Sequence, residues 1–131
     1  MTTPHLRLAR PTRDLAAAEL FWVDGLGLDV LWRGAGTEPG EHDLTMVGWR
    51  DAQWHLELVG GPHLAVTPSP TKEDLFVLYL DSPVDDALVR RLEQCGGTRV
   101  SGGPYWDRWG VTIADPDGYR LVLSTRAWAN T

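Results

Sequence analysis

Residues 11–25 read PTRDLAAAELFWVDG, and residues 83–97 read PVDDALVRRLEQCGG. Both segments begin with a proline and end with a glycine. Three pairs of residues are each 72 positions apart: Pro11 and Pro83, Asp14 and Asp86, and Gly25 and Gly97. The interiors favour helices, with Asp14 placed to cap the first helix and Pro83 to begin the second. The spacing therefore predicts one structural unit that occurs twice.

Strand-like segments surround both predicted helices in the same order, because apolar runs bounded by Gly, Pro and Asp follow each helix. We expect helices at residues 13–25 and 83–95, and strands at residues 5–10, 28–33, 44–49, 54–60, 75–81, 98–101, 109–114 and 119–124. Each half thus reads strand, helix, three strands, and one half alone is too small to bury both faces of its sheet. We predict an α+β fold of two tandem βαβββ modules, whose curved mixed sheets surround a cleft.

The length and composition are those of a globular chain. At 131 residues it fits one domain, and 43% hydrophobic residues suffice for a core. We expect a single domain over residues 1–131, with module one at about 5–62 and module two at about 74–126. The linker between them, at about 62–73, is assigned from its three prolines.

Charge and cysteine usage exclude several classes of protein. The formal net charge of −6 argues against nucleic-acid binding, which relies on Lys and Arg. No apolar stretch is long enough to span a bilayer, and the N-terminus lacks the apolar run of a signal peptide. The single cysteine, Cys95, cannot form an internal disulfide and suits a reducing compartment. We therefore expect a bacterial, cytoplasmic protein that binds neither nucleic acid nor membranes.

Three segments together resemble a known group of proteins: RDLAAAELFWVDGLGLDVLWR at residues 13–33, WHLELV at 54–59 and DPDGYRLVL at 115–123. The last is the most specific, because Asp-Pro-Asp-Gly is a strong turn signal that leads directly into an apolar strand. The chain resembles the vicinal oxygen chelate superfamily, which includes glyoxalase I, extradiol dioxygenases, fosfomycin-modifying transferases and bleomycin resistance proteins. The resemblance implies small-molecule ligands and frequent homodimers.

The resemblance also implies four positions for the ligands of a divalent metal, one on each of four strands. In this chain they fall on Arg7 (or on His5, if the first turn holds two extra residues), on Glu57, on Leu75 and within residues 121–123. The last two positions offer only apolar side chains, so the second module supplies no ligand. We therefore expect no metal cofactor.

One alternative ligand set stays open. His55 and Glu57 are two residues apart on a predicted strand, so both side chains leave the same face. With His5 they could form a two-histidine, one-carboxylate site for a metal-dependent lyase or dioxygenase. The competing interpretation is a His–Glu–Arg hydrogen-bonded group that holds a ligand or only satisfies itself.

The prediction for function is a metal-independent binding protein that sequesters an aromatic or planar compound, with enzymatic activity left uncertain. The predicted ligand-binding residues are Arg7, His55, Glu57, Tyr79, Tyr105, Trp106, Trp109 and Arg120. Of these, the rings within residues 104–109 lie in an expected loop at the cleft mouth. A homodimer is the expected assembly, and a purely structural or regulatory dimer without a ligand stays open.

Overall fold

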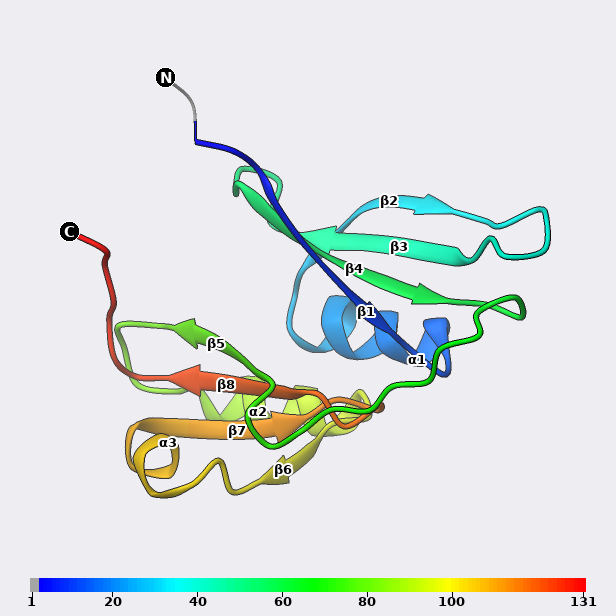
Figure 1. Cartoon of the computed structure of the whole chain (residues 1–131). Coiled ribbons are helices and arrows are strands. Elements are labelled where there is room, and N and C mark those ends of the chain that lie inside the picture. The colour runs from blue at the N-terminus through cyan, green and yellow to red at the C-terminus, as the bar shows by residue number, and fades with distance from the viewer. Residues whose placement is uncertain (1–2) are drawn as a thin grey trace. The chain divides into compact units, whose positions relative to one another are not determined.

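The structure is a computed structural model that describes residues 3–131. Met1 and Thr2, part of the segment in which we expect no signal peptide, lie outside the described residues. The chain divides into two compact units at Pro68 and Ser69, within the predicted linker at about 62–73. Figure 1 shows a mixed sheet and helical segments in each unit. Across the part of the chain that the structure describes, no helix combines the length and apolarity needed to cross a bilayer.

The first unit is built on a four-stranded sheet. Its strands are β1 (Leu6–Pro11), β2 (Asp29–Gly34), β3 (Asp43–Gly48) and β4 (Trp54–Gly60). They lie in the order β1-β4-β3-β2, with β1 parallel to β4 and the other neighbours antiparallel. As an edge strand, β1 accepts Pro11 as its last residue, although we expected that proline to lie beyond the strand.

The second unit repeats this topology. Its strands are β5 (Leu75–Tyr79), β6 (Thr98–Val100), β7 (Gly110–Ala114) and β8 (Arg120–Ser124). They lie in the order β5-β8-β7-β6, with β5 parallel to β8. The strand order is therefore the same in both units, which confirms the predicted α+β fold of two βαβββ modules with mixed sheets.

The helical segment of the first unit changes type along its length. It begins as α1 (Leu15–Glu19), with the Asp14 carboxylate accepting the Ala17 N–H as its cap. It continues as the π-helical segment η1 (Leu20–Gly25), in which the Leu26 N–H donates to the Phe21 carbonyl. The prediction of a single helix over residues 13–25 was therefore wrong in its second half, which is π-helical. Because i→i+5 bonding is rare, a helix-forming composition does not reveal it.

Phe21 and Trp22 of η1 are fully buried, together with Val47 of β3 and Leu56 of β4. Burying each such side chain contributes roughly 1.5–3 kcal/mol. A Cβ at Gly60 of β4 would lie 3.5 Å from Cβ of Leu15. Helix α1 therefore covers the face of the first sheet that carries Leu56, Leu58 and Gly60, since these residues alternate along β4.

Two predictions about the second unit were wrong. Helix α2 (Asp86–Gln94) does not begin at Pro83, because Asp85 is extended and its carboxylate accepts the Ala87 N–H as the cap. Residues 104–109 form the short helix α3 (Pro104–Trp109) rather than a loop. Pro104 is pre-organised for a first helical turn, and the Asp107 N–H donates to the Gly103 carbonyl.

The predicted turn before the last strand is present. The Gly118 N–H donates to the Asp115 carbonyl at 2.9 Å, and Gly118 has a φ of +93°. The Asp115 carboxylate accepts the backbone N–H groups of Asp117 and Tyr119, which fixes the entry to β8. This turn is local in sequence, so its residues specify it completely.

Candidate functional site

One face of the first sheet brings together most of the polar residues predicted for the site. Glu57 points away from Leu56 and Leu58 along β4, and therefore away from α1. The strand register aligns Glu57 with Ala9 and Met46, and aligns Met46 with Trp32. We call this surface the Glu57 face. It consists of Arg7 and Ala9 on β1, His55 and Glu57 on β4, Met46 on β3 and Trp32 on β2.

An ion pair between Arg7 and Glu57 lies at the centre of the Glu57 face. Nε of Arg7 donates to Oε2 of Glu57 at 2.9 Å, and Nη2 donates to the same oxygen. The side chain of Glu57 is 3% exposed, whereas that of Arg7 is 56% exposed. The hydrogen bonds to Glu57, and then its negative charge, raise the pKa of Arg7 above the ordinary value of a guanidinium. The buried carboxylate is thus neutralised by a cation that reaches solvent.

Two imidazoles lie beside this ion pair. Nε2 of His5 and Nδ1 of His55 are 2.8 Å apart, and the ring centroids are separated by 5.0 Å. Burial lowers the pKa of His55, and the charges of His5 and Arg7 lower it further against the opposing effect of Glu57. Nε2 of His55 is buried without a hydrogen-bond partner among the described residues. An unpaired buried polar atom costs about 1–3 kcal/mol, so a hydrogen-bond partner for Nε2 of His55 would stabilise this arrangement.

The structure therefore places His5, His55 and Glu57 on one surface but does not join them into a ligand set. The two histidines bond to each other, and Glu57 bonds to Arg7. Over residues 3–131, no three His, Cys, Asp or Glu side chains gather closely enough to hold a metal ion. In the second unit, Leu75 and residues 121–123 lie in the paired strands β5 and β8, as expected.

The remaining predicted residues belong to the second unit. Tyr79 ends β5 and is 43% exposed, whereas Arg120 begins β8 and donates from Nη1 to the Ser101 carbonyl. The rings of Tyr105 and Trp106 meet edge to face with centroids 4.9 Å apart. Trp109 already has two cationic neighbours, since the guanidinium carbons of Arg108 and Arg126 lie 4.9 and 4.5 Å from its ring centroid.

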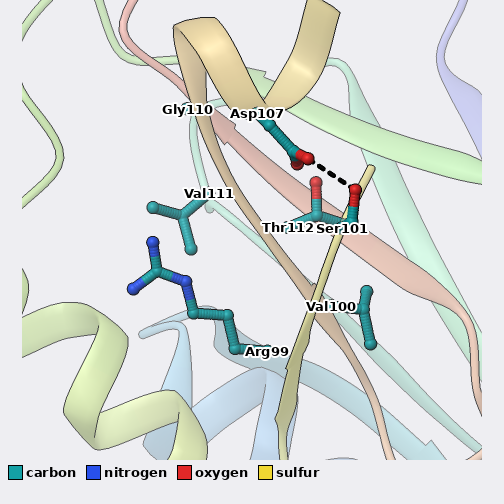
Figure 2. Close-up of a pocket in the computed structure, with 7 residues that line it drawn as sticks. All are labelled: Arg99, Val100, Ser101, Asp107, Gly110, Val111 and Thr112. Atoms are coloured by element: carbon teal, nitrogen blue, oxygen red, sulfur yellow. Dashed lines mark hydrogen bonds between the residues drawn. The ribbon is translucent and has the colours of Figure 1, made fainter. Parts of the chain in front are cut away.

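Helix α3 also forms part of a polar pocket of about 300 Å³ that sequence reasoning missed. Figure 2 shows the bond across it, in which the Ser101 hydroxyl donates to the Asp107 carboxylate. This bond and the Gly102 N–H lower the pKa of Asp107. The Thr112 hydroxyl is buried without a partner among the described residues, and a side chain at Gly102 would collide with it. The pocket depends on the fold of residues 101–109, which sequence reasoning took for a loop.

Trp32 and Met46 are further surface residues that sequence reasoning missed. Trp32 is 56% exposed, and its ring lies over Gly34, where an added Cβ would collide with the ring. The sequence contains both residues within predicted strands, but only the register shows that they align with Glu57. A β-bulge between Val30 and Trp32 sets that register, and the residues around it contain no sequence pattern that predicts a bulge.

Comparison with known proteins gives a family for this arrangement. A family model for the YycE-like N-terminal domain matches residues 6–59, and one for the YycE-like C-terminal domain matches residues 73–125. The chain belongs to the YycE-like family. The chain is 35% identical to the uncharacterised protein YycE of Bacillus subtilis over 121 residues. The aligned residues cover 91% of this YycE-like chain and 86% of the relative.

Solved structures agree with this assignment. The crystal structure of YycE from Bacillus subtilis, a protein of unknown function, matches this YycE-like chain with a TM-score of 0.80 at 31% identity. The match covers 96% of this chain and 92% of the YycE chain. Glyoxalase I of Leishmania major has a TM-score of 0.71 at 17% identity, over 94% and 86% of the two chains. TnmS3, an antibiotic binding protein from Streptomyces sp. CB03234, has a TM-score of 0.60 at 23% identity, over 97% and 98%. These neighbours confirm the predicted vicinal oxygen chelate superfamily, and the last two show the fold alone.

Proposed function

We propose that this YycE-like protein binds and sequesters a small organic molecule, with an aromatic or planar body, without a divalent metal ion. The observation that carries the proposal is the Arg7–Glu57 ion pair. Glu57 occupies the one superfamily ligand position that still holds a carboxylate. Its charge is already balanced by a guanidinium, which in this chain takes the role that a metal ion would have for that carboxylate.

The side chains around Glu57 do not suit a divalent ion. A metal site needs several deprotonated donors that converge on one point. Here Arg7 brings a positive charge to the carboxylate, and the nearest imidazoles are engaged with each other at 2.8 Å.

Exposed aromatic rings support a planar ligand. Trp32 on β2 and the Tyr105–Trp106 pair on α3 each present ring surface, with Tyr105 50% exposed. Ring stacking adds about 0.5–1.5 kcal/mol to the burial of each pair. Such stacking, together with the burial of the ligand's own apolar surface, supports roughly micromolar affinity, about −8 kcal/mol. TnmS3, which has the same fold, is an antibiotic binding protein, and this agrees with a sequestering role.

Tryptophan fluorescence tests the proposal. Planar aromatic compounds, including quinoxaline-type antibiotics, are titrated into the protein beside non-aromatic controls of similar size. We expect saturable quenching by at least one planar compound, weakened in Trp32→Ala or Trp106→Ala and retained in Trp128→Ala. Trp128 serves as the control because it is 72% exposed in the C-terminal segment after β8. No quenching by any planar compound would refute the proposal.

The alternative is a metal-dependent lyase or dioxygenase that uses His5, His55 and Glu57. The closeness of the two imidazoles favours it, but Glu57 would first have to exchange Arg7 for the metal. We also propose that the protein acts as a homodimer in a bacterial cytoplasm. Leu6 and Leu8 on the edge strand β1 are 70% and 47% exposed, and covering them would favour association of two chains.

A further inference from the structure

We propose that the ligand of the Glu57 face is an organic acid, whose anionic group binds Arg7 and one N–H of the adjacent His5–His55 pair while its apolar body lies along Met46 and Trp32. This inference rests on the proposed function, because it assumes that the Glu57 face binds a small molecule. It adds the chemical class of that molecule and names Arg7 as the residue that selects it.

The charges that reach solvent on the Glu57 face favour an anion rather than a cation. Glu57 is 3% exposed, and its Oε2 already accepts two N–H groups from Arg7. A guanidinium carries five N–H donors in one plane, so the donors not used by Glu57 remain for a ligand. Glu57 is the only hydrogen-bond or ion-pair partner of Arg7 within residues 3–131. The accessible polar group is therefore a positively charged donor.

The pair of imidazoles adds one N–H to this donor surface. Arg7 and His55 are direct partners in the β1–β4 register, and His5 bonds to His55. When Nδ1 of His55 donates to His5, Nδ1 of His5 carries the other proton and becomes a donor as well. An anion beside Arg7 would favour that tautomer, because it gives the anion a second partner. Carboxylate and sulfonate groups, whose several oxygens accept hydrogen bonds, fit these donors.

An apolar surface begins directly beside the ion pair. Met46 aligns with Glu57 on the neighbouring strand, and Trp32 aligns with Met46 on the next one. Neighbouring strands lie about 4.8 Å apart, so Trp32 starts roughly 10 Å from Glu57. A flat body of two or three rings can span this distance with its acid group at Arg7. On the other side, Ala9, Val59, Leu64 and Val66 line an apolar groove of about 170 Å³.

Two fluorescent probes separate the acid group from the apolar body. 8-Anilinonaphthalene-1-sulfonate and N-phenyl-1-naphthylamine have the same rings, but only the first carries an anionic group. We expect the wild-type protein to bind the sulfonate about ten-fold more tightly, as a charge-assisted hydrogen bond allows. In Arg7→Met/Glu57→Gln, which keeps the net charge, the two affinities should become equal. Trp32→Ala should weaken both probes alike.

A matched variant controls for the loss of an ion pair as such. Arg33→Met/Glu19→Gln removes the pair between β2 and α1, in which Nη2 of Arg33 donates to Oε1 of Glu19 at 2.6 Å. Its preference for the sulfonate should equal that of wild type. Equal binding of both probes by wild type, or a preference that survives Arg7→Met/Glu57→Gln, would overturn the inference and leave the proposed function standing. Binding of neither probe would overturn the inference, and only the absence of quenching by every planar compound titrated would overturn the proposed function as well.

Discussion

The pairing of a buried carboxylate with an exposed guanidinium makes Arg7 and Glu57 energetically interdependent. Arg7→Met leaves the Glu57 carboxylate buried without its partner, which should destabilise the fold clearly more than the loss of an exposed ion pair does. Arg7→Met/Glu57→Met removes both charges and should recover most of that loss, because apolar replacements of an ion pair are often neutral. Thermal unfolding of both variants, completed as a double-mutant cycle with Glu57→Met, measures this coupling.

Arg33→Met is the control for this cycle, since Arg33 belongs to an exposed pair with Glu19. Exposed pairs contribute about 0–1 kcal/mol, so its effect on unfolding should be small. The account would be contradicted if the loss of stability in the Arg7 and Glu57 double variant equals the sum of the losses in the two single variants, since the side chains would then not be coupled.

His55 should make the stability of the fold depend on pH. Its pKa is lowered from 6.5, mainly by burial, so the unfolded chain takes up a proton before the folded chain does as the pH falls. Stability is therefore complete above about 6.5 and declines as the pH drops from there through the folded pKa. The melting temperature, measured between pH 8 and pH 5, should depend less on pH in His55→Gln than in wild type. His63→Gln, at an exposed position, should leave that pH dependence as in wild type. A wild-type melting temperature that rises on acidification would contradict the argument.

At the scale of elements, Gly102 lies where β7 and α3 leave no room for a side chain. A Cβ at Gly102 would collide with the Thr112 hydroxyl and lie 3.0 Å from Cβ of Trp106. Gly102→Ala should therefore destabilise the protein by about 1–3 kcal/mol, as overpacking does. Gly102→Ala/Thr112→Ala should recover part of the loss, because the colliding oxygen is gone. Chemical denaturation measures both, and equal losses would mean that the strain lies elsewhere.

The elements also show how far the sequence alone reaches. The Asp115–Gly118 turn and the cap at Asp14 are specified by neighbouring residues, and both were predicted. The repeat of 72 residues predicted that both units contain the same succession of strands and helices. Helix α3 was not predicted, because six residues rich in aromatic side chains carry no helical periodicity.

The candidate site was predictable only in part, for the same reason. Arg7, His55 and Glu57 follow from strand alternation and from the superfamily positions. The neighbourhood of Trp32 and Met46 depends on strand register, which a bulge shifts and the sequence does not disclose.

For the whole molecule, we predict a homodimer. Edge strand β1 exposes Leu6 and Leu8, and a chain of this size gains stability by covering them. Sedimentation at micromolar concentration should give twice the 14.5 kDa of one chain. Leu6→Lys/Leu8→Lys should shift the protein toward monomer, whereas Val66→Lys, another exposed apolar position, should not. A wild-type mass near 14.5 kDa would contradict the prediction.

Metal independence of ligand binding is the central claim, because it follows from Arg7 taking the place of a cation beside Glu57. Binding of 8-anilinonaphthalene-1-sulfonate is measured before and after exhaustive chelation, with metal content determined on the same samples. We predict the same affinity in both and no stoichiometric Zn, Ni, Mn or Fe. Loss of binding on chelation, restored by one divalent ion per chain and abolished in Glu57→Ala, would contradict the account.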